Sequence, residues 1–202
     1  MRTIFQNCTL LDGTEQMSPR PGTDVAIEND RIAQIGKITP NKGDRVVDLT
    51  SKYLMPGLIN LHVHLPAGGK PRNKPMNTNR LTKIALSSGL SRALVLRMCH
   101  AYAMQGLLSG VTTVRAVGGL DNLDTRLRDR IHAGKLDGPR ILAANYAIGV
   151  PHGHMVGSVT HPAETVEDAV RMVDQLHGQN VDLIKLMITG GVMDAKVKGE
   201  PG

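Results

Sequence analysis

The strongest constraint on the fold is an alternation of short apolar runs and helix-like segments that begins after Pro56-Gly57. The predicted strands are 58–65, 111–114, 140–146 and 181–188, and the predicted helices between them are 90–108, 123–133 and 165–177. Such an alternation is typical of a parallel α/β sheet, because parallel neighbours need a long crossover that a helix usually supplies. A (β/α)₈ barrel needs eight strands and typically about 250 residues. The sequence therefore predicts either a small open sheet or one half of a barrel.

The first 55 residues have a different pattern, with short β-rich runs and no helical period. Residues 3–11 end at the turn dipeptide Asp12-Gly13, and Asn29-Asp30 separates two further runs in a hairpin pattern. Four short strands enclose only a thin core, so this unit is expected to need strands from elsewhere. We therefore divide the chain into a small β unit (1–55) and an α/β unit (56–202).

The composition excludes several functional classes. The formal net charge of +6 is spread along the chain, and the 202 residues include one Phe, three Tyr and no Trp. So few aromatic residues argue against a stacking platform for single-stranded nucleic acid, and no nucleic-acid partner is expected. No apolar run is long enough for a membrane span, and no signal-peptide pattern precedes the first strand. Cys8 and Cys99 lie far apart and suggest no disulfide framework, so a cytoplasmic protein is expected.

Two histidines stand at the end of the first predicted strand of the α/β unit. His62 and His64 are two residues apart, so in a strand their side chains emerge on the same face, roughly 6–7 Å apart along the chain. That spacing lets two imidazoles converge on one cation. The end of a strand before a Gly/Pro-rich loop is also where α/β folds place active sites. Taken alone, the pair is more simply explained as half-buried strand histidines with ordinary hydrogen-bond partners, and its position favours the metal site.

A single lysine interrupts the last predicted strand. Lys185 lies among apolar residues in 181–188, and an unpaired ammonium in a sheet interior is costly. One reading is a buried salt bridge to a carboxylate. The other is a neutral amine of lowered pKa that adds carbon dioxide to become a carbamate, an anion that can bridge two divalent metals.

The run Met55-Pro56-Gly57-Leu58-Ile59-Asn60-Leu61-His62-Val63-His64 resembles the first barrel strand of the metal-dependent amidohydrolase superfamily. The family signature there is Pro-Gly-Leu-Ile-(Asp/Asn)-x-His-x-His. The resemblance continues, in order, in residues 109–119, 138–141 and 184–192, and so covers nearly the whole chain. The Ile-Lys-x-Met-x-Thr-Gly-Gly form of the last block is most similar to the branch of Xaa-Pro dipeptidases and related carboxypeptidase-type amidohydrolases.

The resemblance implies an α/β fold in which 56–202 form strands 1–4 of a (β/α)₈ TIM-type barrel, preceded by part of a small β-sandwich domain. It implies that His62 and His64 bind the more buried of two divalent metals, expected to be Zn²⁺, and that carboxylated Lys185 bridges both. A metal-bridging hydroxide would then attack an amide carbonyl polarised by the second metal. His154 would contact the substrate near the scissile carbonyl, and a solvated loop histidine is the alternative.

The chain departs from the family pattern at a few positions. Ala116 follows Arg115 where many relatives have aspartate, and His152 and Met155 stand near His154 where relatives often have glycine. The family also takes two further metal-binding histidines and a general-base aspartate from later strands, which are expected beyond residue 202. A C-terminal half or a second chain is therefore expected to complete the barrel. The complete protein is expected to be a homo-oligomer.

The implied activity is hydrolysis of a C–N bond in a small amide, most simply a dipeptide or an N-acyl amino acid. Within the same superfamily, a cyclic amidase or a heterocycle deaminase is the alternative. Outside the enzymes, the chain would be a truncated non-catalytic fragment or a binding or assembly module.

Overall fold

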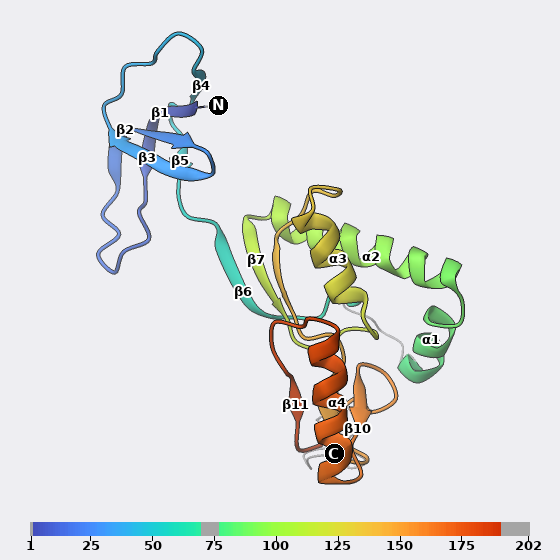
Figure 1. Cartoon of the computed structure of the whole chain (residues 1–202). Coiled ribbons are helices and arrows are strands. Elements are labelled where there is room, and N and C mark those ends of the chain that lie inside the picture. Colours follow the sequence, from blue (N-terminus) through green and yellow to red (C-terminus); the bar gives the residue numbers. More distant parts are fainter. Residues whose placement is uncertain (1, 70–76, 191–202) are drawn as a thin grey trace. The chain divides into compact units, whose positions relative to one another are not determined.

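The computed structural model describes residues 2–69 and 77–190, and the chain divides into two compact units, Met1–Gly57 and Leu58–Gly202. The first unit is a five-stranded sheet (Figure 1). Its strands are β1 (Arg2–Leu10), β2 (Arg20–Glu28), β3 (Arg31–Gly36), β4 (Arg45–Asp48) and β5 (Tyr53–Leu54). Strand β1 pairs antiparallel with β2 and parallel with β4 and β5, while β3 pairs antiparallel with β2 at the edge.

The hairpin predicted at Asn29-Asp30 is present between β2 and β3. Both turn residues have positive φ, 48° and 61°, as a two-residue turn between antiparallel strands requires.

A buried carboxylate, that of Asp24, accepts hydrogen bonds from the backbone N–H groups of Asn7 and Ile38, each at 2.9 Å. These bonds tie the chain after β3 to β1. The two apolar clusters of this unit are small and consist of Ile4, Ala26 and Ile38, and of Cys8, Leu10 and Val25.

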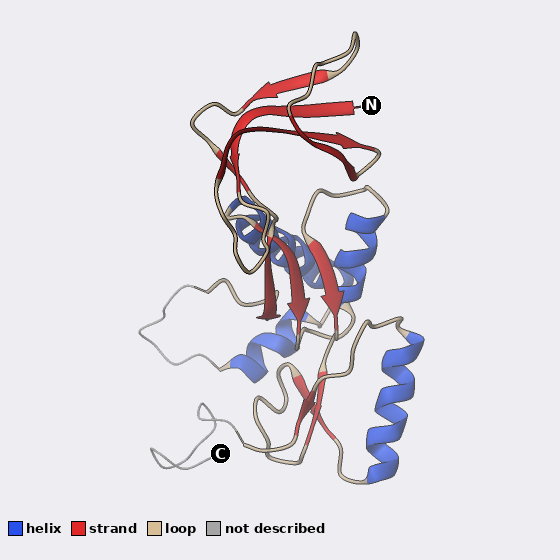
Figure 2. Cartoon of the chain, turned by 90° about the vertical axis from the view of Figure 1, so that its left-hand side faces the viewer, coloured by secondary structure: helices blue, strands red, loops and turns tan. Residues whose placement is uncertain are grey.

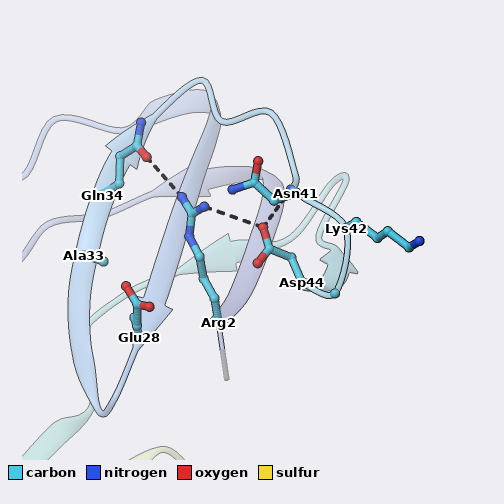
Figure 3. A pocket seen from close by; sticks show the side chains of 8 residues that line it. Arg2, Glu28, Ala33, Gln34, Asn41, Lys42 and Asp44 are labelled. Atoms are coloured by element: carbon cyan, nitrogen blue, oxygen red, sulfur yellow. Dashed lines mark hydrogen bonds and ion pairs between the residues drawn. The ribbon is translucent and has the colours of Figure 1, made fainter.

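A hollow on the first unit is lined by polar residues of β1, β2, β3 and the loop before β4 (Figure 3). Arg2 points across it, donates a hydrogen bond to the Gln34 side chain at 3.1 Å and pairs with Asp44 at 3.5 Å. The lining contains neither a histidine nor a cysteine. The arginine is thus already held by protein groups, and this hollow is not the candidate site.

The second unit contains strands and helices in the predicted order, except that two helices and then three strands follow one another directly (Figure 2). Its elements are β6 (Leu58–Val63), α1 (Thr78–Ala85), α2 (Gly89–Leu108), β7 (Val111–Ala116), α3 (Leu123–His132), β8 (Arg140–Ala143), β9 (Ala147–Gly149), β10 (Thr160–Pro162), α4 (Val166–Gly178) and β11 (Leu186–Met187). Strands β6, β7 and β8 form one parallel sheet, and β10, β9 and β11 form a second. The parallel α/β architecture expected from the alternation is therefore confirmed.

The third predicted strand, 140–146, is shorter than expected and ends at Ala143. Asn145 has a φ of 58°, and this left-handed conformation breaks the extended run. The Asn145 side chain is fully buried, accepts a hydrogen bond from the Thr125 N–H at 3.1 Å, and donates to Thr125 Oγ1 and to Gln179 Oε1. Asn145 therefore connects the first turn of α3 with the end of α4.

The fourth predicted strand, 181–188, was placed too broadly: only Leu186–Met187 is a strand, β11. Its neighbour β9 has three residues, so the ladder between them is short. The preceding residues still lie beside that neighbour, because the Ile148 N–H donates to the Lys185 carbonyl at 2.9 Å.

The long helices begin and end where local signals place them. Helix α2 starts at a capping box formed by Ser88 and Ser91, and α4 at one formed by Thr165 and Asp168. Helix α1, in the segment between the first predicted strand and α2, was not predicted; it is one of the shortest helices and buries none of its residues. No helix in the described ranges is both long and apolar enough to cross a membrane.

Helices α2 and α3 pack on one face of the β6–β7–β8 sheet (Figure 2). The core between them includes Leu96, Cys99, Ala103, Val114, Leu123, Leu127 and Ile141. Edge strand β6, by contrast, contributes little to this core. Leu58, Ile59 and Leu61 remain between 50% and 63% exposed, although the apolar run 58–65 suggested a buried strand. The reason is that β6 pairs only with β7 among the described strands.

Candidate active site

His62 and His64 come together at the end of β6. His62 lies within the strand, and His64 follows its last residue directly. Their ring centroids are 5.4 Å apart, with the ring planes at 66°. The pair therefore stands at the carboxyl end of a parallel strand, which is the edge where α/β folds bind ligands.

The His64 ring is oriented by the chain that follows β7. Its Nδ1 lies 2.9 Å from the Gly118 carbonyl oxygen, so in the hydrogen-bonded tautomer Nδ1–H donates and Nε2 carries the free lone pair. Gly118 has a φ of 147°, and a Cβ at this position would lie 3.1 Å from two atoms of the His64 ring. Glycine is therefore needed for this close approach. A carbonyl that fixes the tautomer is the usual support of a metal-binding histidine.

The electrostatics at His62 favour a neutral imidazole. The side chain is exposed overall, but local desolvation lowers its pKa, and the positive charges of His64, Lys185 and Arg115 lower the pKa further. Only the neutral ring has a lone pair for a cation. Lys185 and Arg115 therefore lie close enough to His62 for their charges to lower its pKa.

Lys185 is less buried than the sequence suggested. It stands just before β11 and is half-buried rather than enclosed in a sheet interior, because the strand that was expected around it is short. No carboxylate of the described residues forms an ion pair with it, so the salt-bridge reading finds no partner there. Of the sequence block around Lys185, Gly191 and Val192 lie outside the described residues.

His154 lies on a tight loop between β9 and β10. Its backbone N–H donates to the Thr189 carbonyl at 3.4 Å, which brings this loop beside the residues that follow β11. His152 and Met155 have φ values of 60° and 55°. This is the left-handed region that favours glycine, so the two departures from the family pattern fall on backbone that a side chain strains.

The described residues fit part of a metal site. His62 and His64 provide two imidazoles, whereas a zinc site normally takes three or four protein ligands. No group of three or more histidine, cysteine, aspartate or glutamate residues gathers in 2–69 and 77–190. The pair is thus a fitting but incomplete ligand set. Two supporting residues were not singled out from the sequence, Gly118 and Arg115, although both lie in a block that carries the family resemblance.

A parallel α/β unit with two histidines at the end of its first strand leaves the class of protein open, and comparisons with known proteins narrow it. The family model described as "Amidohydrolase family" matches residues 53–201. The chain is 44% identical over 66 residues to a 5-methylthioadenosine/S-adenosylhomocysteine deaminase of Thermoanaerobacter pseudethanolicus, covering 32% of this chain and 15% of that protein. It is 42% identical over 70 residues to a dihydroorotase of Pediococcus pentosaceus, covering 35% of this chain and 16% of that protein.

Among solved structures, the chain is similar to a Xaa-Pro dipeptidase with methionine bound in its active site. The TM-score is 0.74 at 26% identity, and the similarity covers 100% of this chain and 50% of that one. The chain belongs to the amidohydrolase family, which is generally metal-dependent. It spans half the length of that dipeptidase, as expected for an N-terminal part of the fold with a partial barrel. The family resemblance seen in the sequence is thereby confirmed.

Proposed function

We propose that this chain is the N-terminal half of a metal-dependent hydrolase that cleaves a C–N bond in a dipeptide or an N-acyl amino acid. The observation that carries the proposal is the His62–His64 pair, with the His64 ring oriented by the Gly118 carbonyl and the charge of Lys185 acting on His62. The similarity to a Xaa-Pro dipeptidase over the whole chain supports this substrate class.

Each residue has a chemical role in the proposal. His62 and His64 would hold a divalent metal, His64 through Nε2, and two Zn²⁺ ions are proposed for the complete site. When bound, such a metal acts as a Lewis acid toward water and toward an amide carbonyl. After losing its ammonium proton, Lys185 would add carbon dioxide, forming an N–C bond and releasing a second proton to solvent, and the carbamate would offer an anionic ligand. The positive charge of Arg115 near this site favours that anion.

His154 is proposed to contact the substrate. Its backbone is hydrogen-bonded to Thr189, so this residue lies close to the segment that follows Lys185. A ring N–H of His154 can donate to a substrate oxygen, with no change in the metal ligands. Replacement of His154 by glutamine, which keeps a donor, should therefore preserve more activity than replacement by alanine.

Completion by a C-terminal half, on the same or a second chain, is part of the proposal, and the whole enzyme is proposed to be a homo-oligomer. Exposed apolar residues lie on one edge strand of each parallel sheet: Ile59 and Leu61 on β6, and Leu186 on β11, with Ile188 just beyond it. An exposed apolar sheet edge is unfavourable in water and is normally covered. A cytoplasmic location is also proposed, and the free thiols of Cys8 and Cys99 support it.

The test is metal analysis and hydrolysis by the chain purified together with its C-terminal half. Bound zinc and cleavage of dipeptides or N-acyl amino acids, both abolished in a His62→Ala/His64→Ala double variant, would support the proposal. A complex that binds no divalent metal, or that hydrolyses no amide, would refute it. Restoration of a Lys185→Ala variant by short carboxylates would further support the carbamate role.

A cyclic amide or an aminated heterocycle is the second candidate substrate class. The observation in its favour is the similarity to a dihydroorotase and to a deaminase over the segments reported above. The same assay separates the two classes if linear dipeptides, a six-membered cyclic amide and an aminopurine nucleoside are compared at equal concentration. Preference for a linear amide supports the first proposal, and preference for a ring substrate supports the second.

A further inference from the structure

The pairing between β6 and β7 is irregular at the first histidine. The aligned pairs on either side of the irregularity are Asn60 with Val114 and Val63 with Ala116. Between these pairs, two residues of β6, Leu61 and His62, face a single residue of β7, Arg115. This arrangement is a β-bulge, which bends a strand, increases its twist and redirects the side chains beside it.

Two side chains supply the hydrogen bonds that the bulge removes from the ladder. The Asn60 Oδ1 accepts a hydrogen bond from the His62 N–H at 3.1 Å. The Arg115 Nε–H donates to the Leu61 carbonyl oxygen at 2.7 Å. A backbone group without a partner is costly unless water or a side chain satisfies it. Asn60 and Arg115 thus hold the backbone on both sides of the Leu61–His62 peptide.

Packing cannot fix this part of β6 by itself. Leu61 is 53% exposed and His62 is also exposed, so few apolar contacts restrain the strand in the described residues. The spacing of the His62 and His64 rings, 5.4 Å between centroids, therefore depends on backbone hydrogen bonds and on the Gly118 contact.

We propose that Asn60 and Arg115 are positioning residues that maintain the bulge and thereby set the two imidazoles at a spacing that one divalent cation can bridge. The inference rests on the proposed metal site but concerns residues that would not ligate the metal. Partners that orient a metal ligand typically change metal affinity about 10- to 100-fold when they are removed.

The first experiment uses the metal-free chain of 202 residues. Hydrogen exchange of the His62 amide, followed by NMR, should be about three- to tenfold faster in Asn60→Ala than in the wild type, and restored in Asn60→Asp, which keeps the acceptor. Exchange of the Val117 amide, which donates to Val63 beyond the bulge, should not change. Equal His62 exchange in the wild type and Asn60→Ala would overturn the role of Asn60.

The second experiment uses the chain purified together with its C-terminal half and titrates it with Zn²⁺ and with Co²⁺, whose visible spectrum reports ligand geometry. Asn60→Ala and Arg115→Met should bind about tenfold or more weakly than the wild type, with an altered Co²⁺ spectrum, while Asn60→Asp recovers the affinity. Arg97→Met, an exposed arginine on α2, is the matched control. Unchanged affinity and spectrum in folded Asn60→Ala and Arg115→Met would overturn the inference. A wild-type complex of the chain with its C-terminal half that binds no metal would instead refute the proposed metal site.

Discussion

Asp124 makes the stability of the α/β unit depend on pH. It lies in the first turn of α3, is fully buried, and neither carboxyl oxygen has a hydrogen-bond partner among the described residues. Burial raises its pKa from 3.8 to about 7. The N-terminus of a helix favours a carboxylate by only about 0.3–1 kcal/mol, which is smaller than this effect of burial.

The size and sign of the effect follow from that shift. The folded chain holds the Asp124 proton up to about pH 7, whereas the unfolded chain releases it near pH 3.8. The folded state therefore binds more protons between these values, and the free energy of unfolding falls as the pH rises. A difference of about three pKa units corresponds to about 4 kcal/mol, present below pH 4 and lost by pH 8.

Asp124→Asn removes this titration and keeps the side-chain shape. The buried amide costs a constant amount, on the order of 1–3 kcal/mol, because its hydrogen bonds are also unmade. The free energy of unfolding of the variant minus that of the wild type should therefore rise by about 4 kcal/mol from pH 4 to pH 8.

Urea unfolding followed by circular dichroism at several pH values measures this difference, since other titrating groups cancel between the two proteins. Asp129→Asn, on the exposed side of the same helix, is the control and should show little pH-dependent difference. A difference for Asp124→Asn that is constant within about 0.5 kcal/mol across this range would refute the reasoning.

Three further predictions concern backbone conformation and a buried hydrogen-bonded side chain. Gly118→Ala should lower stability by about 1–3 kcal/mol in thermal unfolding, because the residue has a φ of 147° and its Cβ would contact the His64 ring. Gly106→Ala, with open space inside α2, should raise stability by about 0.5–1 kcal/mol. Equal effects of the two substitutions would contradict the structure. Asn145→Ala should cost about 2–4 kcal/mol in urea unfolding, because three side-chain hydrogen bonds are lost; a change below about 0.5 kcal/mol would show that this network does not stabilise the fold. His152→Gly should raise the melting temperature, because it relieves about 1 kcal/mol of strain from the left-handed backbone conformation at this residue. An unchanged or lower melting temperature would contradict this prediction.

The regular elements of the α/β unit could be predicted because their signals are local. Helices α2, α3 and α4 lie within one or two residues of their predicted bounds, since apolar periodicity and capping residues act over a few positions. The strand around Lys185 was predicted too long because an apolar run does not reveal how long its neighbour is. Strand β9 is short, and the ladder ends with it.

In the candidate site too, the features that depend on neighbouring residues were predicted, and those that depend on distant residues were not. The closeness of His62 and His64 follows from a spacing of two residues and was predicted. The groups that orient them, Arg115 and Gly118, are each 54 residues away from their partner in the sequence. Only the pairing of β6 with β7 brings these segments together, and no local pattern encodes which carbonyl a ring will meet.

The exposed strands indicate how much stability the described fold lacks. Five large apolar residues lie on or next to the edge strands β6 and β11: Leu58, Ile59, Leu61, Leu186 and Ile188. Full burial of such a side chain contributes about 1.5–3 kcal/mol, and at least half of each is still exposed. Covering all five would add on the order of 5 kcal/mol, which is as large as the whole stability of many domains. The partner proposed to complete the barrel would therefore contribute to the folding of this chain as well as to its chemistry, and its binding would also restrain β6, the strand that carries His62.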